Sequence, residues 1–132
     1  MAINAIRSLE KGNFVAHIEL EPSRVGVLLN PLDKVLALHG SLHIPYSHIK
    51  SVKHEPVPKA WFRGLRIGTR IPGVKVAGTF FTGAGRIFYD FHDPEHCLTF
   101  ELAHETYKQV VVEVNRDQDP ATLAARILLR LG

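Results

Sequence analysis

Apolar and polar residues alternate with a period of two along most of this chain, which is the pattern of β-strands that bury one face. In the first such run, Phe14, Ala16, Ile18 and Leu20 fall on one parity, and Val15, His17 and Glu19 fall on the other. Comparable runs predict strands at 24–29, at 35–38, from 42 leading on to 52, at 65–67, 75–82, 86–92, 98–102 and 110–114. Apart from the two shortest runs, at 35–38 and 65–67, they give about seven consecutive strands joined by short turns, which predict an antiparallel meander rather than a parallel sheet.

The connections between these runs differ in length. Gly83-Ala84-Gly85 is a glycine loop between two strand patterns and predicts an antiparallel hairpin. Residues 54–74 contain three prolines and three glycines, which predict a long irregular connection. Aromatic residues occupy both parities of the hairpin, so both of its faces are expected to be covered, one by the core and the other by more core or by a partner. These aromatic residues are Phe80, Phe81, Phe88, Tyr89 and Phe91.

The end of the chain changes from a strand period to a helix period. Asp119 suits the N-cap and Pro120 the first helical position, and no helix breaker follows up to Leu131. An apolar stripe recurs every four residues and needs a surface to cover, which the open end of a β-barrel would supply. The stripe consists of Leu123, Ile127 and Leu131, widened by Ala124 and Leu128.

Composition bounds the class of protein. The 132 residues, 45% hydrophobic and 22% charged, are expected to form a single soluble domain over 1–132. The lone Cys97 opens an alternating run and cannot form an intrachain disulfide, so we expect a buried strand residue and a reducing compartment. Charges interrupt the N-terminus before any run of signal-peptide length, and this predicts a cytoplasmic protein.

Charge is unevenly distributed. Residues 50–86 carry eight of the sixteen lysines and arginines and only one acid, whereas residues 87–132 carry eight acids and four bases. The basic segment is therefore a candidate site for an anionic ligand or partner. The alternative is that its bases pair with the acids that follow, at Asp90, Asp93, Glu95, Glu101 and Glu105. The candidate ligand-binding residues are Lys59, Trp61, Arg63, Arg66, Arg70 and Lys75.

The stretch Leu42-His43-Ile44-Pro45-Tyr46-Ser47-His48-Ile49-Lys50-Ser51-Val52 resembles the I-P-Y-S-x-I-x-x-V segment of bacterial pleckstrin-homology-like (PH-like) domains, at the turn from the third strand into the fourth. The order of elements in this chain, about seven strands and then one amphipathic helix, also resembles that of PH-like domains. The resemblance implies a mainly β, antiparallel barrel capped by one C-terminal α-helix, acting in binding or scaffolding, not catalysis, with no cofactor. Glu19–Arg24, where family members that bind phosphoinositides carry bases, holds two acids and one base, so the usual lipid site is not expected.

The run His92–Cys97 contains five potential metal ligands in six positions. Because Asp93-Pro94 favours a turn and no second histidine and cysteine cluster completes a zinc site, we interpret the run as a turn and expect no metal. No motif for a catalytic nucleophile or a phosphate loop is present, and no catalytic residue is assigned.

The sequence predicts a non-enzymatic module that recognises a protein partner or associates with itself. The first alternative is peripheral binding of anionic lipid headgroups through residues 59–75. The second is nucleic-acid binding through the same bases, which lacks the repeated exposed aromatics of a stacking platform.

Overall fold

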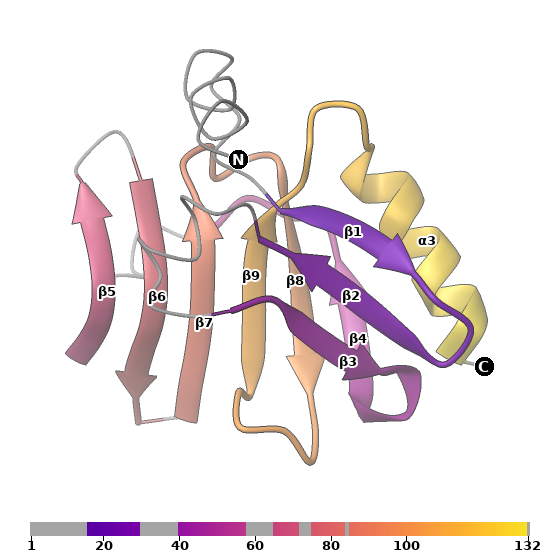
Figure 1. The fold of residues 1–132 in the computed structure, drawn as a ribbon, viewed down its shortest axis with the longest axis horizontal. Coiled ribbons are helices and arrows are strands. Elements are labelled where there is room, and N and C mark those ends of the chain that lie inside the picture. The colour runs from indigo at the N-terminus through magenta and orange to yellow at the C-terminus, as the bar shows by residue number, and fades with distance from the viewer. Residues whose placement is uncertain (1–15, 30–39, 58–64, 72–74, 84, 132) are drawn as a thin grey trace.

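The structure is a computed structural model that describes residues 16–29, 40–57, 65–71, 75–83 and 85–131, with the backbone alone at 65–71 and 75. It is mainly β, with two sheets and one C-terminal helix (Figure 1). The smaller sheet is antiparallel, in the order β1 (His17–Leu20), β2 (Arg24–Leu28), β3 (Leu42–Pro45). A short 3₁₀ turn, η1 (Tyr46–His48), leads from β3 into the larger sheet. The larger sheet runs β4 (Ile49–Lys53), β8 (Cys97–Leu102), β9 (Gln109–Glu113), β7 (Gly85–Phe91), β6 (Lys75–Thr82), β5 (Leu65–Ile71).

The smaller sheet lies across the β9–β8–β4 part of the larger one, and the main core fills the space between them (Figure 1). The alternation predicts this packing, because one parity of each strand points inward. Val25 and Val27 of β2 and Phe100, Val110 and Val112 of the larger sheet are all fully buried.

A second apolar cluster lies on the opposite face of the larger sheet. Phe80 and Tyr89 pack edge to face there, with ring centroids 4.9 Å apart. Phe88, one residue before Tyr89, belongs instead to the main core. The prediction that both faces of the hairpin are covered is therefore confirmed, and Thr82 pairs with Gly85 across the expected glycine loop. Cys97 is buried in the second cluster, as predicted.

The predicted antiparallel meander is wrong in one respect. β9 lies between β8 and β7 and pairs with β7 in parallel. The turn at 92–96 must therefore cross the end of β9 to connect β7 with β8. The buried Glu113 makes this crossing possible, because its Oε1 accepts hydrogen bonds from the backbone N–H groups of His92 (2.8 Å) and Asp93 (2.9 Å).

The predicted closed barrel is not formed by the described strands, which make two sheets linked by one parallel bridge between Ala16 and Val114. The strand expected at 35–38 lies outside the described residues. The strand expected at 65–67 is longer than predicted, extending as β5 to Ile71.

The C-terminal helix α3 (Pro120–Leu131) begins where the sequence predicts. Asp119 caps it, with Oδ2 accepting hydrogen bonds from the Thr122 backbone N–H (2.9 Å) and hydroxyl (2.6 Å). Leu123 and Ile127 are buried against the main core. Leu128, expected in the buried stripe, is 47% exposed, so that assignment was wrong. It follows Ile127 by about 100° around the helix, which turns it away from the sheet.

Candidate binding surfaces

Most of the predicted basic site lies outside the residues that the structure describes. Arg66 and Arg70 lie on β5, in register with Phe80 and Val76, and Lys75 begins β6; their side chains are not described. Lys59, Trp61 and Arg63 lie outside the described residues. Binding of an anionic ligand or surface through this segment thus stays a prediction from sequence.

Two acids that were expected to neutralise the basic segment pair elsewhere. Oδ2 of Asp93 accepts a hydrogen bond from Arg116 Nη2 at 2.9 Å, and its Oδ1 accepts one from the Glu95 backbone N–H at 3.0 Å. The hydrogen bond from Glu95, followed by that from Arg116, holds the pKa of Asp93 below its usual value. Glu105 pairs with His48 at the opposite end of the sheet.

The predicted turn at 92–96 is confirmed. Asp93 accepts hydrogen bonds through its backbone oxygen from His96 N (3.2 Å) and Cys97 Sγ (3.3 Å). Arg116 and His92 both contact the buried Glu113 carboxylate, at 3.3 and 2.7 Å. These contacts give the polar residues of the run a structural role. Among residues whose side chains are described, no group of three or more histidine, cysteine or acidic side chains is placed to hold a metal.

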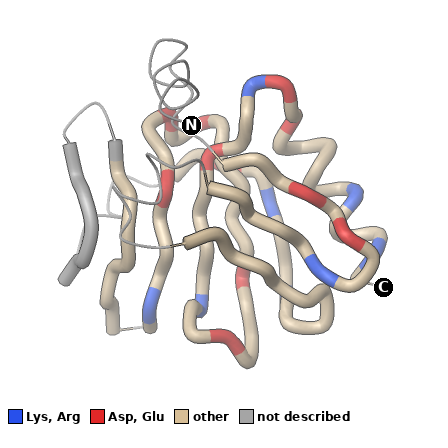
Figure 2. The backbone as a smooth tube through the Cα atoms, viewed as in Figure 1, with Lys and Arg blue, Asp and Glu red and all other residues tan. Residues whose placement is uncertain are grey.

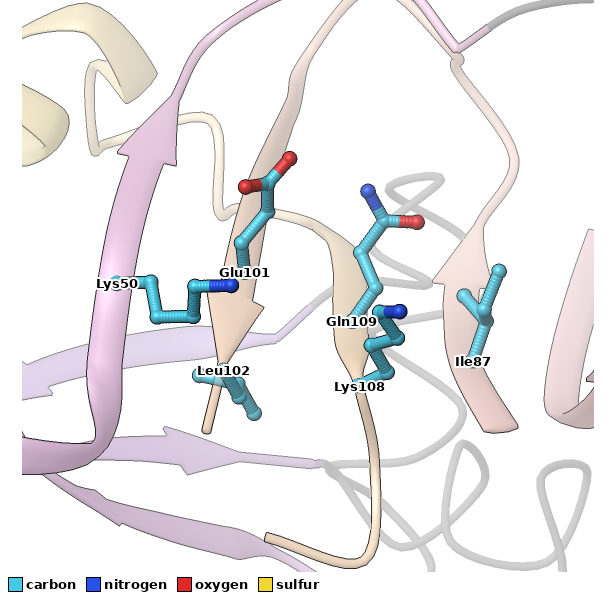
Figure 3. Close-up of a pocket in the computed structure, with 6 residues that line it drawn as sticks. All are labelled: Lys50, Ile87, Glu101, Leu102, Lys108 and Gln109. Carbon is cyan, nitrogen blue, oxygen red and sulfur yellow. The ribbon is translucent and has the colours of Figure 1, made fainter. Parts of the chain in front are cut away.

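A pocket of about 210 Å³ opens on the larger sheet, away from the smaller sheet. Ile87, Gln109 and Glu101 form one row across β7, β9 and β8. A bulge in β4 between Ile49 and Ser51 places Lys50 at the pocket, since an extra residue re-aims the side chains around it. Figure 3 shows the Lys50 side chain extending toward Glu101. The lining residues are Lys50, Ile87, Glu101, Leu102, Lys108 and Gln109.

The side chains that line this pocket are mostly polar, and their charges partly cancel. Its lining has two amines, one carboxylate and one amide, and the carboxylate of Glu101 offsets part of the positive charge. Sequence reasoning did not single these residues out, because they come from four strands, β4, β7, β8 and β9, and from Lys108 just before β9. No linear spacing connects them.

The exposed side of α3 is a second candidate surface. Leu128 is 47% and Leu129 is 84% exposed, and they are the two large hydrophobic residues exposed among those whose burial is described. Ala125 is exposed one turn before them, and Ala121 is exposed two turns before them. Spacings of four, seven and eight residues place all four on one side of a helix. We call Ala121, Ala125, Leu128 and Leu129 the outer strip of α3.

α3 is held in place by hydrogen bonds before and after the outer strip. Before the helix, the Gln118 side chain accepts a hydrogen bond from Ile18 N (2.9 Å) and donates one to Ile18 O (2.8 Å), which joins the loop to β1. Near its end, Arg130 Nη1 donates to Glu21 O at 3.1 Å, and its guanidinium lies over the Tyr46 ring at 5.5 Å. The outer strip is therefore presented on a helix whose position is fixed from both ends.

Comparison with known proteins finds no family model, curated protein or solved structure that matches this chain. Within the described residues, no helix combines the length and the apolar character needed to cross a membrane.

Proposed function

We propose that this chain is a non-enzymatic binding module of the PH-like kind, and that it recognises a protein surface through the outer strip of α3. The observation that carries the proposal is the exposure of Leu128 and Leu129 on a helix that is otherwise well packed. Adjacent exposed leucines on a fixed helix are typical of a protein contact, because water around them is released when a partner covers them. The PH-like assignment is supported by Leu42–Val52, which spans β3, η1 and most of β4.

A fixed surface binds more tightly than a mobile one because less conformational entropy is lost on association. The Gln118 and Arg130 contacts supply this preorganisation. The opposite side of α3 also holds the helix in place, because Leu123, Ala124 and Ile127 are buried against the main core.

The proposal is tested with a photoactivatable amino acid at position 129 of the full chain, introduced in cells that express it. We expect a discrete protein adduct, either with another protein or with a second copy. Gly83 is the matched control site, because it is exposed and an added side chain there meets nothing within 4 Å. No protein adduct from position 129, or equal adducts from both positions, would contradict the proposal.

The lipid and nucleic-acid alternatives depend on residues 59–75 and stay predictions. A membrane surface is a competing occupant of the outer strip, because an exposed pair of leucines near arginines can also enter a membrane surface.

A further inference from the structure

We infer that the partner of the outer strip is a second copy of this chain, bound by antiparallel packing of α3 against α3 about a two-fold axis. This inference rests on the proposed function, since it names the protein surface that the strip recognises. Three properties of α3 carry it: the order of small and large residues, the order of charges, and the position of Ala125.

Residue size changes from one end of the outer strip to the other. Ala121 and Ala125 occupy its first half, and Leu128 and Leu129 occupy its second half. In an antiparallel pair centred on Ala125, Ala121 faces Leu129 of the partner. Leu129 then fills the space that the opposing Ala121 leaves, as packing of large against small residues requires, while Leu128 faces Thr122 of the partner. A parallel pair would instead bring leucine against leucine and leave the alanines apart.

Charge changes in the same direction. The acids Asp117 and Asp119 stand before the helix, and the bases Arg126 and Arg130 lie in its second half. Figure 2 shows acidic positions in the loop that precedes α3, next to a basic position, and basic positions toward the end of the helix. The base in the loop is Arg116, which is paired within the chain with Asp93 and Glu113. An antiparallel partner places the basic second half of one helix alongside the acidic loop that precedes the other, and it also opposes the two helix dipoles, which is favourable.

The geometry of a two-fold pair makes a specific prediction at its centre. Residues 121 and 129 are equidistant from residue 125, so Ala125 meets its own copy on the axis. Cα atoms lie about 2.3 Å from a helix axis, and closely packed helices have axes about 8 Å apart. The two Ala125 Cα atoms are then separated by roughly 3.5–5.5 Å, which overlaps the range that a disulfide spans.

The test is therefore an engineered cysteine in the full chain. Ala125→Cys is expected to form an intermolecular disulfide with its own copy. The native Cys97 is fully buried and does not compete. Leu129→Cys alone is not expected to cross-link, because its two copies lie about 12 Å apart along the helices. A mixture of Ala121→Cys and Leu129→Cys is expected to give the mixed dimer.

Gly83→Cys, at the exposed hairpin loop, measures cross-linking by random collision. Cross-linking of Ala125→Cys no faster than that of Gly83→Cys would overturn the inference. So would Leu129→Cys homodimers in place of the mixed dimer, because they require a parallel pair.

Association is measured independently by sedimentation of the unmodified chain up to millimolar concentration. A single helix pair is a small interface, so we expect a weak dimer. Leu129→Arg is expected to weaken it roughly 30-fold or more, as removal of a central contact does. Because Leu129 is 84% exposed, the variant keeps its fold, which circular dichroism verifies. A chain that stays monomeric over the whole range overturns the inference, while an adduct at position 129 with a different protein would leave the proposed function intact.

Two further outcomes are decisive. Arg126 lies one residue past the two-fold axis, so the two copies of Arg126 repel each other. Arg126→Gln is therefore expected to tighten the dimer roughly two- to fivefold. Unchanged or weaker association would contradict the antiparallel register.

A membrane surface is tested with anionic and neutral vesicles. Binding of the monomer to anionic but not neutral vesicles, lost in Leu129→Arg, would identify a membrane surface as the occupant and overturn the inference.

Discussion

The two sides of α3 have similar residues but opposite surroundings. The inner side, with Leu123, Ala124 and Ile127, is buried against the core between the sheets. The outer side repeats the same residue types in the outer strip and leaves Leu129 84% exposed. Composition alone does not distinguish a face that stabilises the fold from one that is available to a partner. The difference between them is measurable, because inner residues should govern stability and outer residues should govern association.

The largest effect is expected at the inner side. Ile127→Ala should lower the free energy of unfolding by ~2–5 kcal/mol, since Ile127 is fully buried and the truncation leaves a cavity. Urea denaturation of the dilute chain measures the change. A loss below about 1 kcal/mol would mean that α3 packs weakly on the sheets, and the contrast between its two sides would disappear.

The second-largest effect on stability is expected at the hydrogen bonds that Gln118 makes just before the helix. Gln118→Leu removes both hydrogen bonds to the Ile18 backbone and should destabilise the fold by roughly 1–3 kcal/mol, because the N–H and C=O of Ile18 lose their partners. Hydrogen exchange at Ile18 and along α3 should accelerate together. Faster exchange at Ile18 without any change in α3 would show that the helix is positioned by apolar packing alone.

A smaller effect is expected at the N-cap. Asp119→Ala should destabilise the fold less than Ile127→Ala, since Asp119 is exposed and its side-chain hydrogen bonds within the chain go to Thr122 in the first turn of the helix. Hydrogen bonds from Thr122 lower the pKa of Asp119. A lowered pKa in the folded state means that this contribution is present above the ordinary carboxyl pKa of about 3.9, and is lost as the pH falls through the lowered value.

Acid unfolding of Asp119→Ala and the unmodified chain measures this contribution. The difference in stability between them should be constant near neutral pH and shrink under acid. A difference that grows on acidification would contradict the capping role.

The smallest effect on stability is expected at the outer strip. Leu129→Ala should change the free energy of unfolding by no more than about 0.5 kcal/mol, as is usual at an exposed site, yet it should weaken the dimer. Thermal unfolding at low concentration and sedimentation at high concentration separate the two properties. If Leu129→Ala proved as destabilising as Ile127→Ala, the two sides of α3 would share one structural role.

Local patterns in the sequence predicted most elements of the fold. Alternation predicted the strands around Val25, Phe100 and Val112, and the glycines at 83 and 85 predicted the hairpin. The cap at Asp119 and the spacing of Leu123 and Ile127 predicted α3. These succeeded because each depends on neighbouring residues and on a fixed period.

Features formed by residues far apart in sequence were missed. Glu113 continues an alternating run and looks like an outward-facing acid, yet it is fully buried, because the turn at 92–96 passes over the end of β9. The pocket near Lys50 depends on a bulge and on residues of four neighbouring strands, β4, β8, β9 and β7. The exposure of Leu128 was not predicted, because its spacing from Leu123 and Ile127 also fits a broad buried stripe.

The sequence by itself determined that this chain alternates into strands, ends in a capped amphipathic helix and concentrates its bases at 50–86. Only the tertiary structure decided that β9 inserts between β7 and β8 and that Leu128 and Leu129 face outward. The physical reason is that alternation and capping are local, whereas strand order and the orientation of α3 depend on long-range contacts. Gln118 to Ile18 and Arg130 to Glu21, each joining residues about a hundred positions apart, fix which side of the helix is left exposed.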